Sequence, residues 1–107
     1  MWQAILTPKA VRHLNKLKRK NETGLIQSFD RAIQDLQHDP FRGEPKGGDL
    51  KDLWGWEFNF KGVAYRIAYL IAREQLCVLI ISLGSHEGFW QQAKDYWNKY
   101  KGEFQNP

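Results

Sequence analysis

Three runs rich in apolar residues follow one another in the second half of the chain. They span residues 53–60, 63–72 and 76–83. In the first two runs large apolar side chains fall on every second position, which is the period of a β-strand. Residues 77–83 are apolar on both faces, so we expect a central strand that is covered on both sides. The pattern therefore predicts three consecutive strands of one sheet.

The turn between the first two runs sets their register. If Lys61 and Gly62 form a two-residue turn, Glu57 lies directly opposite Arg66. The aromatic side chains of both runs then share one face, which we assign to the core. Arg66 lies on the other face between two alanines. We expect it to sit in a shallow trough that is open to a planar anion.

Helical periodicity dominates the first third of the chain, after a short strand expected at residues 2–6. Thr7 and Pro8 predict a helix start, because threonine caps free N–H groups and proline fits the first helical position. This helix extends to about Lys20, with Val11 among the residues that face inward. A second helix is expected from about residue 25 to 37, and the two predict an antiparallel hairpin.

The remaining segments complete the expected fold. Residues 39–49 contain two prolines and three glycines, so we expect a loop without a regular element. A closing helix is expected at residues 89–101. The order β-α-α-β-β-β-α predicts an α+β fold, with an antiparallel-dominated sheet, an N-terminal helical hairpin and a C-terminal helix. The length of 107 residues predicts a single domain over residues 1–107.

Composition narrows the cellular setting. The single cysteine, Cys77, argues against a disulfide framework and a cysteine-ligated metal site. The N-terminus lacks the layout of a signal peptide, and the apolar runs have the length of strands. We therefore expect a cytoplasmic protein that is not inserted in a membrane.

Positive charge is concentrated near the N-terminus. The net charge is +4, and residues 1–21 hold six basic residues and no acidic one. Four of the basic residues follow helical spacing and form a stripe along one helix face. They are Lys9, Arg12, Lys16 and Arg19. Such a stripe is typical of a surface for nucleic acid or an acidic protein, although an ordinary solvated helix face explains it equally well.

Five short motifs occur in a fixed order along the chain. They are Thr-Pro-Lys-Ala at 7–10, Asp-Pro-Phe-Arg-Gly-Glu-Pro at 39–45, Gly-Asp-Leu-Lys-Asp-Leu-Trp at 48–54, Tyr-Arg-Ile-Ala-Tyr at 65–69 and Ile-Ser-Leu-Gly-x-His at 81–86. Each motif is degenerate alone. Their order and spacing resemble the RelE/ParE superfamily of bacterial and archaeal type II toxins over essentially the whole chain. The resemblance implies either a ribosome-dependent mRNA endonuclease or an inhibitor of DNA gyrase that cuts nothing.

Individual residues match the nuclease branch of this superfamily, closest to YoeB-like and RelE-like toxins. Arg66 matches the arginine that contacts the scissile phosphate, and His86 lies where YoeB-like toxins have a catalytic histidine. Glu44 is similar to the glutamate of YoeB-like toxins that serves as general base. Two positions depart from the pattern. Trp90 stands where a tyrosine is commoner, which removes a phenol as proton donor, and Glu57 replaces a residue that is basic in RelE.

The chemistry implied by the resemblance is cleavage of RNA by its own 2′-hydroxyl. It needs a base for the hydroxyl, positive charge at the phosphate and an acid for the leaving 5′-oxygen. It yields a 2′,3′-cyclic phosphate and calls for no metal ion or cofactor. Arg66 would hold the phosphate, His86 would be the acid, and either Glu44 or Glu57 would be the base. The residues expected to contact RNA are Lys9, Arg12, Lys16, Arg19, Lys51, Phe89 and Trp90.

The resemblance also implies partners. A cognate antitoxin is expected to neutralise the toxin, in an assembly that can be a heterotetramer, and the ribosome and mRNA are the expected targets. DNA gyrase is the alternative target if the chain is a ParE-like inhibitor. A third alternative is a catalytically degenerate member that binds only its antitoxin or RNA.

Each catalytic assignment has a purely structural alternative. Arg66 can pair with Glu57 across the strands, which does not exclude a phosphate contact in a complex. His86 can cap a strand end or lie on the surface. Glu44 can be an ordinary loop carboxylate.

The same holds for the remaining aromatic and histidine residues. Phe89 and Trp90 lie at helical spacing and can belong to a helix core rather than a platform for RNA bases. His13 and His38 have no constellation of catalytic or metal-binding residue types around them in the sequence, and we assign them no role.

Overall fold

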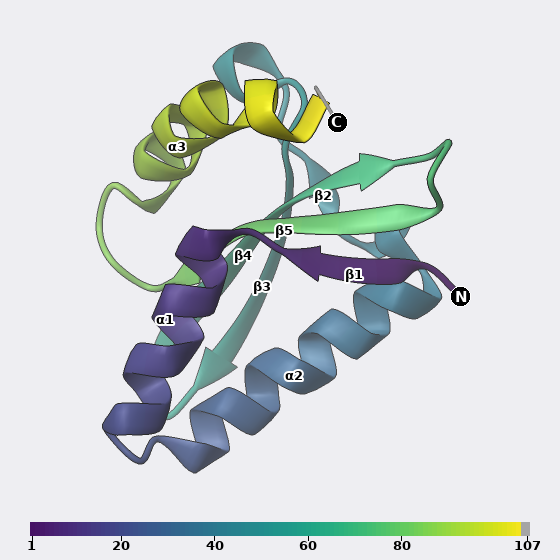
Figure 1. Ribbon diagram of the computed structural model, residues 1–107. Coiled ribbons are helices and arrows are strands. Elements are labelled where there is room, and N and C mark those ends of the chain that lie inside the picture. The colour runs from purple at the N-terminus through teal and green to yellow at the C-terminus, as the bar shows by residue number, and fades with distance from the viewer. Residues whose placement is uncertain (106–107) are drawn as a thin grey trace.

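The computed structural model describes residues 1–105 and consists of a five-stranded sheet between two helical layers (Figure 1). The helices are α1 (Pro8–Arg19), α2 (Thr23–His38) and α3 (Phe89–Gln105). The strands are β1 (Gln3–Leu6), β2 (Glu44–Pro45), β3 (Trp54–Phe60), β4 (Val63–Ala72) and β5 (Cys77–Gly84). They lie in the order β1-β5-β4-β3-β2, with β1 parallel to β5 and the other neighbours antiparallel. The predicted α+β fold is confirmed.

The predicted register of β3 and β4 is also confirmed. Glu57 lies opposite Arg66, and Phe60 pairs with Val63 across the turn. Both turn residues have positive φ, 50° at Lys61 and 81° at Gly62. This is the geometry of the two-residue turns whose twist matches that of the strands they join. The turn therefore fixes which residue of β3 faces Arg66.

The alternation along β4 divides the interior into two cores. Ile67 and Tyr69 belong to the core under α1 and α2, whereas Ala68 belongs to the core under α3. β5 is buried from Cys77 to Leu83, as expected for a strand that is covered on both faces. Arg66 shares the α3 side of β4 with Ala68, since residues two apart in a strand point the same way.

The start of α1 is as predicted, whereas its inward face and the start of α2 are not. Thr7 is fully buried, and its hydroxyl oxygen accepts a hydrogen bond from the Ala10 N–H and donates one to the Ile81 carbonyl at 2.7 Å. The prediction that Val11 faces the core is wrong, because its side chain is 42% exposed. Asn21 ends the first helix at a φ of 56°, which asparagine tolerates well. α2 then begins at Thr23, earlier than expected.

Replacing Thr7 with valine is expected to lower the free energy of unfolding by about 1–3 kcal/mol, because the cap and the bond to β5 are lost together. Valine keeps the branched shape and the burial. Urea denaturation of Thr7→Val beside Thr23→Val, at an exposed position that starts α2, measures the effect. Equal stability of the two variants would show that the Thr7 hydroxyl does not hold α1 to the sheet.

The segment after α2 is more regular than predicted. Residues 40–42 and 48–50 form 3₁₀ turns, and Glu44–Pro45 form β2, so the expectation of an irregular loop is wrong. β2 pairs with Gly55 and Trp54 at the edge of the sheet. Proline is tolerated in an edge strand because its missing N–H leaves no hydrogen bond of the sheet unmade there. The Tyr69 hydroxyl anchors the segment by donating to the Pro40 carbonyl at 2.6 Å. The segment therefore brings Glu44 to the edge of β3.

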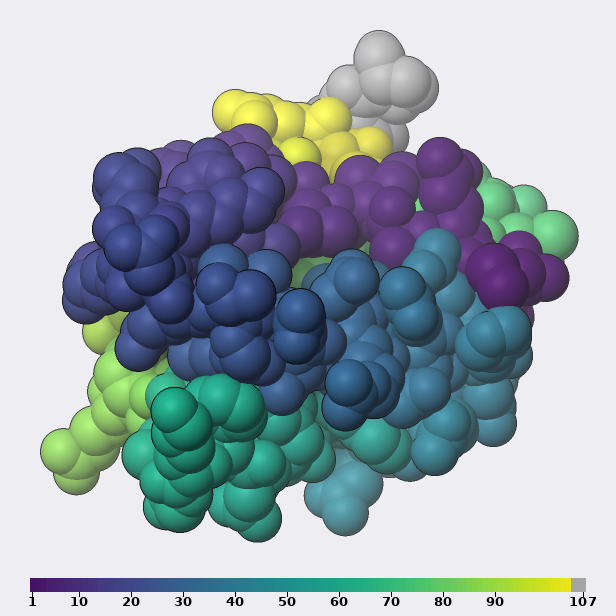
Figure 2. Space-filling model, turned by 90° about the horizontal axis from the view of Figure 1, so that it is seen from below, coloured from purple at the N-terminus to yellow at the C-terminus, as the bar shows by residue number. Residues whose placement is uncertain are grey.

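The surface opposite α3 is formed by the helical hairpin. In the view of Figure 2, α1 and α2 lie side by side and cover the sheet, and the loop after β5 projects at the lower left in light green. Within residues 1–105, no helix has both the length and the apolar character needed to cross a membrane.

Candidate functional site

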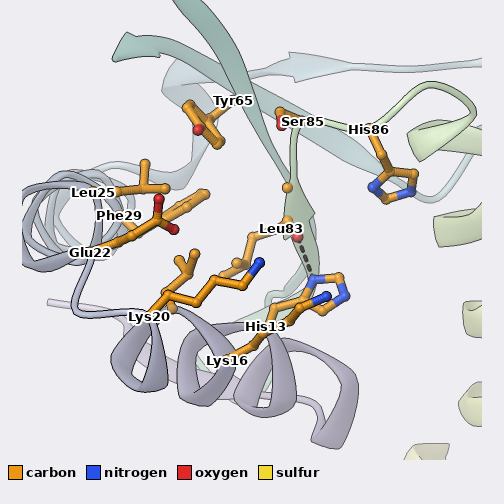
Figure 3. Close-up of a pocket in the computed structure, with 12 residues that line it drawn as sticks. His13, Lys16, Lys20, Glu22, Leu25, Phe29, Tyr65, Leu83, Ser85 and His86 are labelled. Carbon is orange, nitrogen blue, oxygen red and sulfur yellow. Dashed lines mark hydrogen bonds between the residues drawn. The ribbon is translucent and has the colours of Figure 1, made fainter. Parts of the chain in front are cut away.

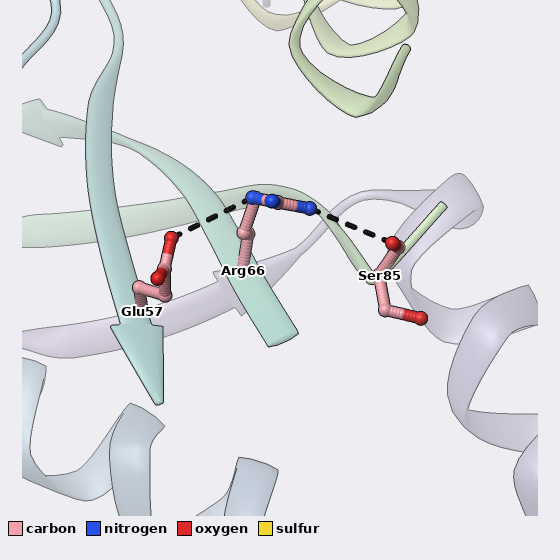
Figure 4. A network of polar contacts seen from close by, with 3 residues as sticks. All are labelled: Glu57, Arg66 and Ser85. Carbon is pink, nitrogen blue, oxygen red and sulfur yellow. Dashed lines mark hydrogen bonds and ion pairs between the residues drawn. The ribbon is translucent and has the colours of Figure 1, made fainter. Parts of the chain in front are cut away.

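Arg66 lies where β4 meets the end of β5. Its cross-strand neighbours are Glu57 on β3 and Gly84 on β5. Arg66 Nε lies 3.6 Å from Glu57 Oε2, and Nη1 donates to the Ser85 carbonyl at 3.5 Å (Figure 4). The Arg66 side chain is 29% exposed. Its guanidinium is therefore held between two strands with part of its donor surface open to solvent, as a phosphate clamp requires.

The two glutamates named from the sequence share one cavity. Glu44 pairs with Gly55, which lies two residues before Glu57 on the same face of β3. Both carboxylates line a cavity of about 340 Å³, and Trp90 at the start of α3 lines it as well. Both residues are exposed at the sheet edge. The structure therefore brings Glu44, Glu57 and Trp90 together, with Arg66 joined to them through its ion pair.

Lys46 belongs to this cavity, although no pattern in the sequence singled it out. Its ammonium lies 4.4 Å from the centre of the Trp90 ring, a cation–π distance. Trp90 in turn packs over Gly55, where an added Cβ would lie 2.7 Å from the indole. The signal available in the sequence was the two-residue spacing from Glu44, which becomes informative only once β2 is recognised as a strand.

His86 directly follows Ser85, the residue whose carbonyl accepts a hydrogen bond from Arg66. Its ring packs edge-on against Phe89, with ring centroids 5.7 Å apart. Nε2 of His86 is buried and has no hydrogen-bond partner in the part of the chain that the structure describes. Buried polar atoms are almost always paired, so an unpaired one marks a position that a ligand or water can fill.

Phe89 is a correction to the RNA-contact residues named from the sequence. Its side chain is only 2% exposed and packs in the core under α3. A ring that is covered on both sides cannot stack on a base without unfolding the helix start. Trp90 is half-buried and stays accessible at the cavity edge.

A second cavity of about 240 Å³ lies between the helical hairpin and the end of β5 (Figure 3). It brings His13 and Lys16 of α1, and Lys20 directly after that helix, together with Ser85 and His86. Nδ1 of His13 is hydrogen-bonded to the Leu83 carbonyl. The apolar part of the cavity lining consists of Leu17, Leu25, Phe29, the ring of Tyr65 and Leu83. We call it the hairpin cavity.

Burial lowers the pKa of His13 below its usual value. The bond to the Leu83 carbonyl opposes this shift, while the neighbouring Lys9, His86 and Lys16 add to it. At neutral pH His13 is therefore an uncharged ring within a positively charged setting. The position of His13 could not be read from the sequence because Leu83, to which it is hydrogen-bonded, is 70 residues away along the chain.

Of the four residues in the basic stripe, one lines either of these two cavities. Lys16 lines the hairpin cavity, whereas Arg12 and Arg19 are exposed on α1 away from both cavities. Lys9 is half-buried with its ammonium over the Tyr96 ring of α3, and burial lowers its pKa. Lys51 is placed elsewhere, in a separate cavity beside α3 with Lys94 and Trp97.

Comparison with known proteins supports the assignment of the fold. A family model described as the ParE-like toxin of type II bacterial toxin–antitoxin systems matches residues 5–94. No curated protein sequence matches the chain. The chain is similar to a chain of the RelBE2 toxin–antitoxin complex from Mycobacterium tuberculosis, with 24% identity over 79% of this chain and 98% of that chain and a TM-score of 0.63.

Two further solved structures are similar in fold. The isolated E. coli RelE toxin has 16% identity over 89% of this chain and 97% of its own, with a TM-score of 0.62. A double mutant of E. coli RelE in the free state has 15% identity over 92% and 95%, with a TM-score of 0.70. These likenesses show a shared fold, and the family model spans most of the chain. The chain therefore belongs to the ParE-like toxin family of type II bacterial toxin–antitoxin systems.

Proposed function

We propose that this toxin is an endoribonuclease that cleaves mRNA on the ribosome and thereby inhibits translation. The observation that carries the proposal is the placement of Arg66, which is held between Glu57 and the Ser85 carbonyl, with His86 following Ser85 directly in the chain. A partly open guanidinium can bind a phosphate and an imidazole can transfer a proton, and cleavage of RNA uses both functions. The likeness of the fold to RelE is consistent with this activity.

In the proposed reaction Arg66 binds the two non-bridging oxygens of the scissile phosphate and stabilises the charge that grows on them. A base takes the proton of the 2′-hydroxyl, whose oxygen attacks phosphorus. The bond to the 5′-oxygen breaks, and His86 donates a proton to that oxygen. The products are a 2′,3′-cyclic phosphate and a 5′-hydroxyl. Glu44 and Glu57 are the carboxylates available as base on the sheet side.

We further propose that a cognate antitoxin neutralises the toxin in the cytoplasm, by analogy with the toxin–antitoxin complexes that share its fold. The exposed cations of α1, Arg12 and Arg19 among them, offer a surface that an acidic antitoxin segment can cover. The heterotetramer expected from the sequence is one form this complex can take.

Replacing His86 with alanine is expected to abolish growth inhibition and to lower cleavage by about 10²–10⁴-fold, the range that one general acid contributes. The measurement is growth after induction of the wild type and of His86→Ala, together with incorporation of labelled methionine. Thermal unfolding checks that the variant folds. A folded variant that still arrests growth and translation would refute the role of His86.

Inhibition of DNA gyrase is the second candidate function, because the matching family model is that of ParE-like toxins. A gyrase inhibitor acts by binding, so its activity would survive loss of His86 and would appear in a supercoiling assay. Arrest of supercoiling by purified toxin, with translation unaffected, would favour this candidate over the nuclease.

A further inference from the structure

A second histidine reaches the end of β5 from the opposite side to Arg66. Nδ1 of His13 is bonded to the Leu83 carbonyl, and a carbonyl oxygen can only accept. Nδ1 must therefore carry the proton. In the neutral ring Nε2 then has a free lone pair, so the backbone fixes the tautomer in which Nε2 is a proton acceptor.

The hairpin cavity places this acceptor with His86, the acid of the proposed reaction, and with Ser85, through which Arg66 is connected to the cavity. His13 and His86 line the same cavity from two different elements, α1 and the loop before α3 (Figure 3). Nε2 of His86 is buried and has no hydrogen-bond partner within residues 1–105. Ser85 lines the cavity too, and its carbonyl accepts from Arg66. Lys16 adds positive charge at the rim.

We propose that His13 Nε2 is the general base that accepts the 2′-hydroxyl proton of RNA bound in the hairpin cavity, with His86 as the general acid. This inference rests on the proposed ribonuclease function and identifies its base. The 2′-oxygen bonds to phosphorus, the bond from phosphorus to the 5′-oxygen breaks, and the proton passes from His86 to that oxygen. Each turnover leaves His13 protonated and His86 deprotonated, and exchange with water restores both.

The two carboxylates are less suited to this role. Glu57 is engaged by Arg66 at 3.6 Å, which makes it a positioning residue for the guanidinium. Glu44 is exposed and lines the other cavity, which does not contain His86. A pair of histidines on two elements can lie on either side of one phosphate, as attack and departure in line demand.

The environment of His13 suits a base. Burial lowers its pKa, and Lys9 and Lys16 of α1 and His86 of the facing loop lower it further. Lys20 and Glu22 also line the cavity. Because the folded pKa lies below the ordinary value of about 6.5, His13 is unprotonated and competent at neutral pH and loses competence as the pH falls below its own pKa.

The test uses His13→Asn, because the asparagine amide can keep the hydrogen bond to the Leu83 carbonyl while Nε2 is lost. We expect mRNA cleavage to fall by about 10²–10⁴-fold with an unchanged thermal unfolding midpoint. The matched control is His38→Asn at the end of α2, which is expected to cleave as the wild type does. Cleavage by His13→Asn at the wild-type rate would overturn the inference and leave the ribonuclease proposal standing.

Two further readouts separate a base from a structural residue. Added imidazole is expected to restore part of the activity of His13→Ala, which a lost hydrogen bond alone would not permit. The wild-type rate is expected to fall as the pH drops through the lowered pKa of His13, whereas a carboxylate base would hold the rate down to about 4.3. A rate that falls only at about 4.3, as a carboxylate base predicts, overturns the inference even if both variants fail to fold. A wild type that cleaves no RNA with or without ribosomes overturns the proposed function and this inference with it.

Discussion

Replacing Arg66 with alanine is expected to lower the rate of mRNA cleavage by about 10²–10³-fold, the loss typical of removing one donor that stabilises transition-state charge. Stability is expected to change by less than about 1 kcal/mol, because the pair with Glu57 is partly exposed and such pairs contribute little. The Glu57 side chain is 59% exposed, so its carboxylate remains hydrated when Arg66 is replaced. The measurements are single-turnover cleavage of ribosome-bound mRNA and the midpoint of thermal unfolding.

Two control variants sharpen this experiment. Arg66→Lys keeps the charge but lacks the planar fork that binds two phosphate oxygens, so we expect a loss between those of the wild type and Arg66→Ala. Arg73→Ala removes a guanidinium that stacks on Phe41, outside both cavities, and is expected to cleave normally. Parallel losses of cleavage and stability in Arg66→Ala would mean that Arg66 is a structural residue.

Replacing Gly43 with alanine is expected to destabilise the fold by about 1–3 kcal/mol, the usual cost of overpacking a dense interior. A Cβ at this position would overlap the Tyr69 hydroxyl and the Gly55 carbonyl oxygen. The φ of −77° is open to any residue, so the cost is steric. Relief would require Tyr69 to leave Pro40, whose carbonyl accepts its hydroxyl at 2.6 Å.

Thermal unfolding measures this effect, since 1 kcal/mol moves the midpoint by about 4–8 °C in a domain near this size. The matched control is Gly102→Ala in α3, where an added Cβ meets no atom of the described residues within 4 Å. That change is expected to be neutral or slightly stabilising because alanine favours a helix. A Gly43→Ala variant as stable as the control would mean that β2 and the segment before it are not anchored through Tyr69.

Short-range patterns accounted for most of the fold. The turn at Lys61 and Gly62 sufficed to place Glu57 opposite Arg66, because a two-residue turn allows one register. Alternation along β4 correctly placed Ile67 and Tyr69 on the opposite face from Ala68. These features depend on residues that are close in sequence, where period and turn chemistry act directly.

Features that depend on distant residues were not predictable in this way. β2 has only two residues and exists because β3 offers an edge, which no local pattern reveals. His13 faces β5 while Val11 is exposed, a choice made by the rotation of α1 against the sheet. The burial of Phe89 depends on how α3 packs rather than on its spacing.

The candidate site likewise contains contacts between residues close in sequence, which could be predicted, and contacts between distant residues, which could not. The ion pair of Arg66 and Glu57 could be predicted, since both lie in one hairpin. The contribution of Lys46 and His13 could not, since each meets its neighbours only after β2 or α1 has docked. The roles of Arg66, His86, Glu44 and Glu57 in catalysis stay predictions, and the cleavage experiments above address them one at a time.

The most direct test of the central claim maps mRNA 5′ ends by primer extension after purified toxin is added to a translation mixture. Parallel reactions contain naked mRNA and the His86→Ala variant. A ribosome-dependent ribonuclease predicts new ends within codons that appear only with ribosomes, carry 5′-hydroxyl groups and are lost in the variant. Intact mRNA in every reaction, at a toxin concentration that arrests growth, would contradict it.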